Sequence, residues 1–182
     1  WQYEVPGSLE PLLVLRAALA NVRSNYAFIL LDCAPNLGIV TANGLMMADA
    51  YVVPAIPDVL STYGIPQLQR RVQRFTDRTG HTLTPLGLII TKYRGSSSLH
   101  RTTIERLQRA VFEYDALPAH ERASRPRPPT VIPHWIPESN QIAQSADFVD
   151  FGTLRQKYGT HGQFETLRNV TDHLVQNVGV YL

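Results

Sequence analysis

The chain has 182 residues, a hydrophobic fraction of 44% and a formal net charge of +2. This length is enough for one ordinary domain with a buried core, and the composition is that of a globular chain and excludes intrinsic disorder. No apolar run is long enough to span a bilayer and no basic-then-apolar leader opens the chain, so we expect a soluble, cytoplasmic protein without a membrane partner.

The N-terminal part of the sequence alternates between helical and strand patterns. Leucine and valine recur at helical spacing over Ser8–Arg23, which predicts an amphipathic helix. Phe28–Leu31 is a short continuous apolar run, typical of a strand buried on both faces. A second helix is expected over Leu37–Met47 and a second strand over Tyr51–Ala55.

The alternation continues to the end of the chain. The expected elements are a helix over 65–78, a strand over 86–91, a helix around 104–111, a short strand over 130–133, a short helix over 139–146 and a closing helix over 167–178. Strands that alternate with helices predict an α/β fold with a mostly parallel sheet flanked by helices. We expect one domain over residues 1–182, in which the segment 115–130, rich in proline and arginine, is an exposed loop.

Asp32 follows the first expected strand directly. In an open parallel sheet, ligands bind beyond the carboxyl ends of the strands. A carboxylate at that end can hold Mg²⁺, which usually keeps several waters and binds nucleotide phosphates, and this is the role of a Walker-B aspartate. Pro35 and Gly38 would shape a tight turn near the phosphates. An aspartate that merely caps a helix or a turn fits the same local pattern, and this alternative stays open.

Three segments together resemble the ParA/MinD family of partition and positioning ATPases. They are FILLDCAPNLGIVTANGLMMADAYVVPAIPDVLSTYGIPQLQ at 28–69, LGLIITKYRGSSSLHRTTIERL at 86–107 and TVIPHWIPESNQIAQSADF at 130–148. The resemblance implies a P-loop NTPase fold of the SIMIBI or ParA-like type and extends over most of the chain. The sequence departs from the usual pattern at Ala34, where the family has proline, and at His134 and Trp135.

The resemblance also implies roles for individual residues. Asp32 matches the Walker-B acid and metal ligand, and Pro35 and Gly38 match the switch-like loop behind it. The segment near the nucleotide base is matched by Thr91 and Tyr93, and Pro133, followed by His134, matches the loop that lines the adenine pocket. Trp135 has the size to stack on a base, although a partly covered core tryptophan is the alternative.

By this resemblance the parent protein binds and slowly hydrolyses Mg²⁺-ATP. ATP would drive a homodimer that binds DNA without sequence preference, and a centromere-binding, ParB-like partner would stimulate hydrolysis in chromosome or plasmid partition. Such a protein would be cytoplasmic and associated with the nucleoid. The DNA-binding residues expected in this region are Arg94, Arg101, Arg106 and Arg109. A solvated salt-bridge ladder through Arg101, Glu105 and Arg109 is the alternative for the same helical face.

Neither lysine of the chain lies in a phosphate-binding loop. Lys92 stands in ITKY and Lys157 in RQKY, and neither follows glycines at P-loop spacing. Two hypotheses follow for this sequence. It is the C-terminal portion of a complete ATPase whose P-loop lies upstream, or it is a truncated, non-catalytic paralogue that acts as a dimerising adaptor or DNA-binding module. Under either hypothesis we expect the chain alone to be inactive as an enzyme.

Overall fold

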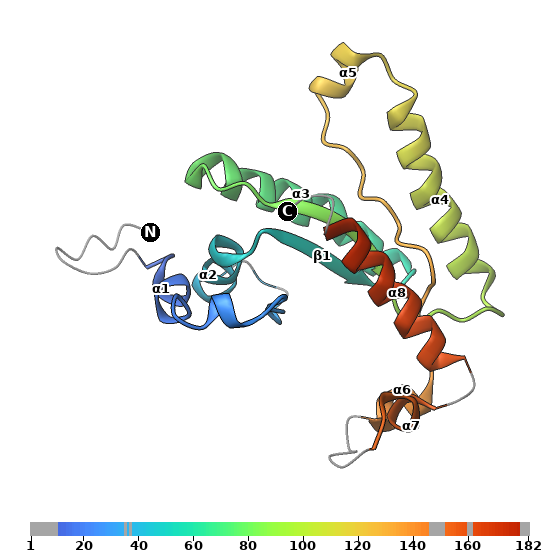
Figure 1. Ribbon diagram of the computed structural model, residues 1–182. Helices are drawn as coiled ribbons and strands as arrows, with labels where there is room; N and C mark the ends of the chain where they lie inside the picture. Colours follow the sequence, from blue (N-terminus) through green and yellow to red (C-terminus); the bar gives the residue numbers. More distant parts are fainter. Residues whose placement is uncertain (1–10, 35, 37, 146–151, 160–161, 179–182) are drawn as a thin grey trace. The chain divides into compact units, whose positions relative to one another are not determined.

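The computed structural model describes residues 11–34, 36, 38–145, 152–159 and 162–178 (Figure 1). The chain contacts divide into two compact units, Trp1–Tyr51 with Arg71–Thr84 and Val52–Arg70 with Pro85–Leu182. The predicted α/β class is confirmed by a parallel sheet with flanking helices. Whether the chain forms a single domain stays a prediction.

The first unit contains short helices near the start of the described chain. Helix α1 covers Val14–Ala18, and a 3-10 turn follows at Arg23–Asn25. The helix predicted over 8–23 is therefore much shorter, and its residues 8–10 lie outside the described part. None of the residues of α1 is buried. Because most helical stability in proteins comes from packing an apolar face, leucine spacing alone does not extend this helix.

Helix α2 of the same unit agrees with the sequence. It covers Ile39–Met47 and begins after Gly38, whose extended backbone is its N-cap. Its buried side includes Leu45 and Met47. The ring of His81 lies 2.8 Å from the carbonyl oxygen of Ala48, so the end of α2 is tied to the segment that follows α3.

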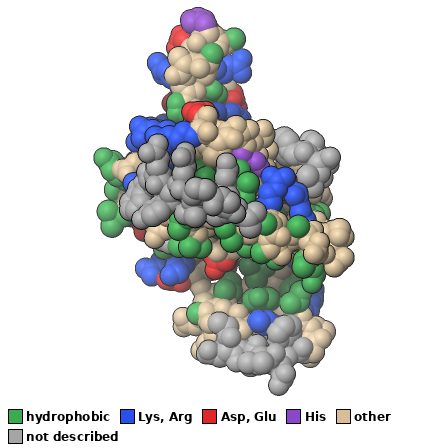
Figure 2. All heavy atoms as spheres, turned by 90° about the vertical axis from the view of Figure 1, so that its left-hand side faces the viewer, with side chains coloured by type: hydrophobic (Ala, Val, Ile, Leu, Met, Phe, Trp, Pro, Cys, Tyr) green, Lys and Arg blue, Asp and Glu red, His purple; other side chains and the backbone are tan. Residues whose placement is uncertain are grey.

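The strand predicted over Phe28–Leu31 is wrong. This segment has neither helix nor strand assigned, and Leu30 is 94% and Phe28 52% exposed. A strand exists only where a neighbour completes its ladder of hydrogen bonds, and within the described residues this segment has no such neighbour. Phe28 and Leu30 consequently remain exposed. Figure 2 shows that hydrophobic side chains also lie at the surface of the chain in that view.

A parallel βαβ unit forms the sheet. Strand β1 covers Ala50–Ala55, helix α3 covers Val59–Thr79, and strand β2 covers Thr84–Ile90. The two strands run in the same direction, because the hydrogen bonds between them join Thr84 N–H to the Asp49 carbonyl and Thr91 N–H to the Ala55 carbonyl. The predictions of both strands and of the intervening helix are confirmed, with bounds that differ by a few residues.

A third extended segment follows the other side of β2. Parallel bridges join Leu88 to Val131 and Tyr93 to Pro137. The strand predicted over 130–133 is thus reduced to isolated bridges. Pro133 and Pro137 have no N–H to donate, so a continuous ladder cannot form along this segment.

The core of the second unit lies between this sheet and its helices. Helix α4, Ser98–Asp115, contributes Ile104, which is 1% exposed. Ile104 belongs to one cluster with Ile65 of α3 and with Leu88 and Ile90 of β2. Burial of each such side chain contributes about 1.5–3 kcal/mol to folding, so this cluster anchors the loops that leave the sheet.

Four shorter or peripheral helices complete the described chain. They are α5 (Ala119–Ala123), α6 (Asn140–Gln144), α7 (Leu154–Tyr158) and α8 (Gln163–Val178). Helix α5 lies inside the expected loop, and the Tyr114 hydroxyl donates to the carbonyl oxygens of Arg122 and Arg125, so the chain returns beside α4 after α5 (Figure 1). The short and the closing helices predicted from the sequence correspond to α6 and α8, although Ala146 lies outside the described residues. Among the described helices, none has the length and apolarity needed to cross a membrane.

Candidate nucleotide site

The carboxyl ends of β1 and β2 meet at one edge of the sheet. The N–H of Thr91, the first residue after β2, donates to the carbonyl of Ala55 at the end of β1 with a distance of 2.9 Å. Thr91 also lines an open pocket of about 340 Å³ with residues of β1 and of the first half of α3. This is the edge at which ligands bind in parallel sheets, and the sequence-predicted Thr91 lies on it.

Tyr93 brings the loop after β2 against the third extended segment. Its N–H donates to the carbonyl of Ile136, and its carbonyl accepts from the N–H of Glu138, both at 3.0 Å. Its ring meets Trp135 edge to face, with 4.9 Å between the ring centroids. Both rings are partly buried and pack against the core cluster, which agrees with the core alternative for Trp135.

Pro133 and His134 form the turn that leads into Trp135. Both are exposed, and His134 has a left-handed backbone with φ of 67°. Left-handed backbone is uncommon outside glycine and is concentrated at functional sites and turns. The structure therefore brings Thr91, Tyr93, Pro133 and His134 together within the second unit, on loops that leave neighbouring parallel segments.

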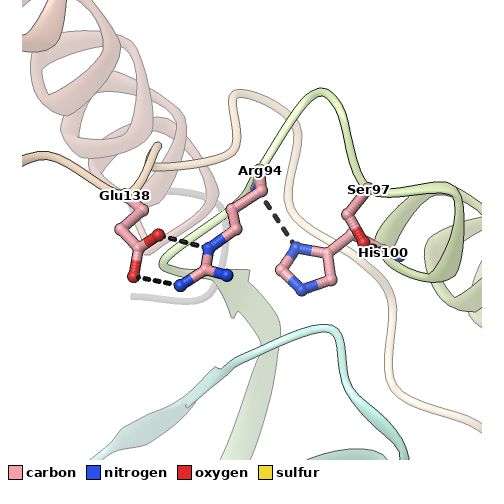
Figure 3. Close-up of polar contacts among 4 residues, drawn as sticks. All are labelled: Arg94, Ser97, His100 and Glu138. Carbon is pink, nitrogen blue, oxygen red and sulfur yellow. Dashed lines mark hydrogen bonds and ion pairs between the residues drawn. The ribbon is translucent and has the colours of Figure 1, made fainter.

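Arg94 joins the same two loops by an ion pair (Figure 3). Its Nε and Nη2 both donate to the carboxylate of Glu138, and the Nη2–Oε1 distance is 3.0 Å. The hydrogen bond and charge of Glu138 raise the pKa of the Arg94 guanidinium. The same hydrogen bond lowers the pKa of the Glu138 carboxyl, and the charges of Arg94, Lys92 and His100 act in the same direction. Sequence reasoning missed Glu138, because no local pattern links it to Arg94 across 44 residues.

Asp32 and Gly38 belong to the first unit. Asp32 is exposed and stands directly before the turn that enters α2. That turn is held by the Thr41 hydroxyl, which donates to the carbonyl of Ala34 at 3.4 Å, and by the Gly38 N–H, which donates to the Asn36 side chain at 3.4 Å. Pro35 lies outside the described residues.

The Asp32 carboxylate could serve as one ligand of Mg²⁺, but it could not hold a metal ion without further ligands from outside the protein. In the described part of the chain, no three His, Cys, Asp or Glu side chains gather into a cluster that could hold a metal ion. Mg²⁺ is commonly bound through one or two carboxylates together with waters and substrate phosphates. A single exposed carboxylate therefore fits a metal that arrives with a nucleotide.

The four arginines expected to bind DNA fall into two pairs. Arg106 and Arg109 are exposed on α4, and among the described residues neither has an ion-pair partner. Arg101 instead donates to the carbonyl of Gly95 at 2.8 Å, and Arg94 is paired with Glu138. The alternative salt-bridge ladder is not formed, since within the same described residues Glu105 makes no ion pair.

Known proteins are similar to this chain along most of its length. A family model described as an AAA domain matches residues 2–84. The chromosome partitioning protein ParA of Caulobacter vibrioides is 34% identical over 116 residues, which cover 60% of this chain and 43% of that protein. The chromosome-partitioning ATPase Soj of Treponema pallidum is 32% identical over 95 residues, or 52% of this chain and 38% of Soj. These matches support the resemblance to the ParA/MinD-like partitioning ATPases that the sequence indicated.

Solved structures share the fold of this chain. A variant of McdA from Cyanothece in complex with ATP has a TM-score of 0.66 and 18% identity, and the match covers 91% of this chain and 58% of that one. Cobyrinic acid a,c-diamide synthase from Mycobacterium smegmatis, with a bound ATP analogue and magnesium, has a TM-score of 0.55 and 26% identity over 70% of this chain and 46% of that one. This ParA-like chain thus has the P-loop NTPase fold, and it spans less than half the length of the curated relatives it matches.

Proposed function

We propose that the full-length protein is a ParA-like partitioning ATPase that binds and slowly hydrolyses Mg²⁺-ATP. The observation that carries this proposal is the convergence of Thr91, Tyr93 and the 133–137 turn at the carboxyl edge of a parallel sheet. Similarity to partitioning ATPases supports it, as do the nucleotides bound by the similar structures.

Each of the predicted residues would have a distinct task in nucleotide binding. Thr91 and the turn at Pro133 and His134 would surround the base, and Tyr93, which packs on the core residue Trp135, would give it an aromatic support. Asp32 would hold Mg²⁺ through its carboxylate, directly or through water, and the backbone near Gly38 would shape the loop beside the phosphates. When bound, Mg²⁺ would neutralise negative charge on the phosphates of ATP.

The proposal extends to partners and location. ATP would favour a homodimer, and the dimer would bind duplex DNA without sequence preference through exposed arginines on α4. A centromere-binding, ParB-like protein would stimulate hydrolysis and release the dimer from DNA, in chromosome or plasmid segregation. The protein would act in the cytoplasm on the nucleoid.

A non-catalytic dimerising adaptor is the competing function. It is favoured by the apolar side chains at the surface of the first unit, among them Leu30 at 94% and Val40 at 80% exposure, which could serve association without hydrolysis.

Light scattering on the full-length protein separates the two. We expect the ATPase to double its mass with Mg²⁺-ATP and not with ADP, and Asp32→Asn to abolish the change. Asp77→Asn, on the exposed face of α3, is the matched control and should dimerise like the wild type. Dimerisation that is independent of nucleotide and of Asp32 would favour the adaptor.

A further inference from the structure

The Arg94 guanidinium forms an ion pair with Glu138. Two of its nitrogens donate to the two carboxylate oxygens of Glu138, in the forked arrangement drawn in Figure 3. Bidentate, charge-assisted bonds of this kind are the strongest hydrogen bonds that Arg makes to a carboxylate. A DNA phosphate would have to displace Glu138 before it could use the same donors.

Further hydrogen bonds fix the loop between β2 and α4 at the end where α4 begins. The N–H of Arg94 donates to Nδ1 of His100 at 3.1 Å, and the N–H of His100 donates to Oγ of Ser97, the N-cap of α4, at 3.3 Å. Arg101 donates to the carbonyl of Gly95 within the same loop. Arg101 therefore also directs one of its guanidinium donors to the protein itself.

Tyr93 is bound to the third extended segment on both sides of its backbone. Its backbone is hydrogen-bonded to Ile136 and Glu138. The ion pair between Arg94 and Glu138 joins the same two segments through their side chains. The Tyr93 ring lies against Trp135, one residue before Ile136. Without the ion pair, only the two backbone hydrogen bonds and the packing of both rings on the core cluster would hold this aromatic contact.

We propose that Arg94 is a positioning residue that holds Tyr93 against Trp135 in the nucleotide site, and that it is not a DNA contact. This inference rests on the proposed ATP-binding function. It assigns the phosphate contacts of DNA to Arg106 and Arg109 and leaves Arg94 and Arg101 to order the loop after β2.

A double-mutant cycle on the full-length protein tests the assignment. Arg94→Gln and Glu138→Gln should each weaken ATP binding, measured by calorimetry, by about two- to fivefold, the range of exposed ion pairs. The double variant should be no weaker than either single variant, because both remove the same contact. The matched control is the other forked pair of this unit: Arg127→Gln and Asp115→Asn should leave ATP affinity unchanged.

Two readouts distinguish positioning from a general structural role. Inorganic triphosphate has no base, so its affinity should be the same in the wild type and in Arg94→Gln. The salt dependence of duplex DNA binding should also be unchanged, whereas loss of a phosphate contact lowers its slope by about 0.9.

Specific results would overturn the inference. If the wild type binds ATP and both single variants bind it equally well, the positioning role is wrong and the proposed function stands. If the slope of log K for DNA binding against log salt is lower in Arg94→Gln but not in Glu138→Gln, Arg94 contacts DNA and the inference is wrong. If the wild-type protein binds no ATP, the proposed function and this inference both fail.

Discussion

A Cβ atom at Gly87 would lie 2.5 Å from the carbonyl oxygen of Thr130. Gly87 is in the middle of β2 with φ of 126°, a backbone conformation that side chains disfavour. The neighbouring Leu88 N–H donates to the same carbonyl at 2.8 Å, so the third extended segment is bonded to the sheet at this point. The absence of a side chain at Gly87 is therefore what permits the segment carrying Pro133 and His134 to lie against β2.

We predict that Gly87→Ala destabilises the protein by about 1–3 kcal/mol, the range for a strained backbone. Urea unfolding followed by circular dichroism measures the change. Gly64→Ala is the matched control: Gly64 lies inside α3, nothing lies within 4 Å of its added Cβ, and alanine is the better helix former. The control should be neutral or stabilising by roughly 0.5–1 kcal/mol. Equal midpoints for Gly87→Ala and the wild type would contradict the close approach.

The core cluster beneath the site gives a second stability prediction. Ile104 is 1% exposed and belongs to the cluster of β2 and α3, so Ile104→Ala should cost about 2–5 kcal/mol through lost burial and a cavity. Phe112→Ala, on the same helix but 75% exposed, should change stability by less than about 0.5 kcal/mol. Similar losses in the two variants would show that α4 does not pack as described.

The DNA surface on α4 is tested by salt dependence. Replacing both Arg106 and Arg109 with Gln should weaken binding of the full-length dimer to duplex DNA and lower the slope of log K against log salt by about 1.8, if each arginine meets one phosphate. The control changes Arg74 and Arg78 to Gln on α3, an ordinary exposed basic face. A slope that falls only in the control would place the DNA surface on α3.

The Arg94–Glu138 pair predicts a pH dependence. Because Arg94 lowers the pKa of Glu138 in the folded state, the pair contributes stability above the unfolded pKa of about 4.3, and this contribution is lost as pH falls through the lower folded pKa. The stability difference between wild type and Glu138→Gln should accordingly shrink as the solution is acidified below about pH 4. Urea midpoints at several pH values measure it, and a difference that grows with acidity would contradict the assigned sign.

Some of this architecture is readable from local patterns and some is not. The apolar periodicity of α3 and the apolar run of β2 are strong enough that the βαβ unit follows from the sequence. The apolar run at Phe28–Leu31 has the same appearance, yet it forms no strand, because a strand depends on partners that the local sequence does not specify. The place of Asp32 after an apolar run, together with the resemblance, made it a candidate, and the resemblance added Thr91, Tyr93 and Pro133. The role proposed for Arg94 required the structure, because Glu138 is 44 residues away and comes close only in the folded chain.

The most direct test of the central claim is calorimetric titration of the full-length protein with ATP, in the presence and absence of Mg²⁺. We expect one ATP site per chain, tightened by Mg²⁺, with that tightening removed by Asp32→Asn and retained in Asp77→Asn. Absence of ATP binding, or binding that Mg²⁺ and Asp32 do not affect, would contradict the account and leave the dimerising adaptor as the better description.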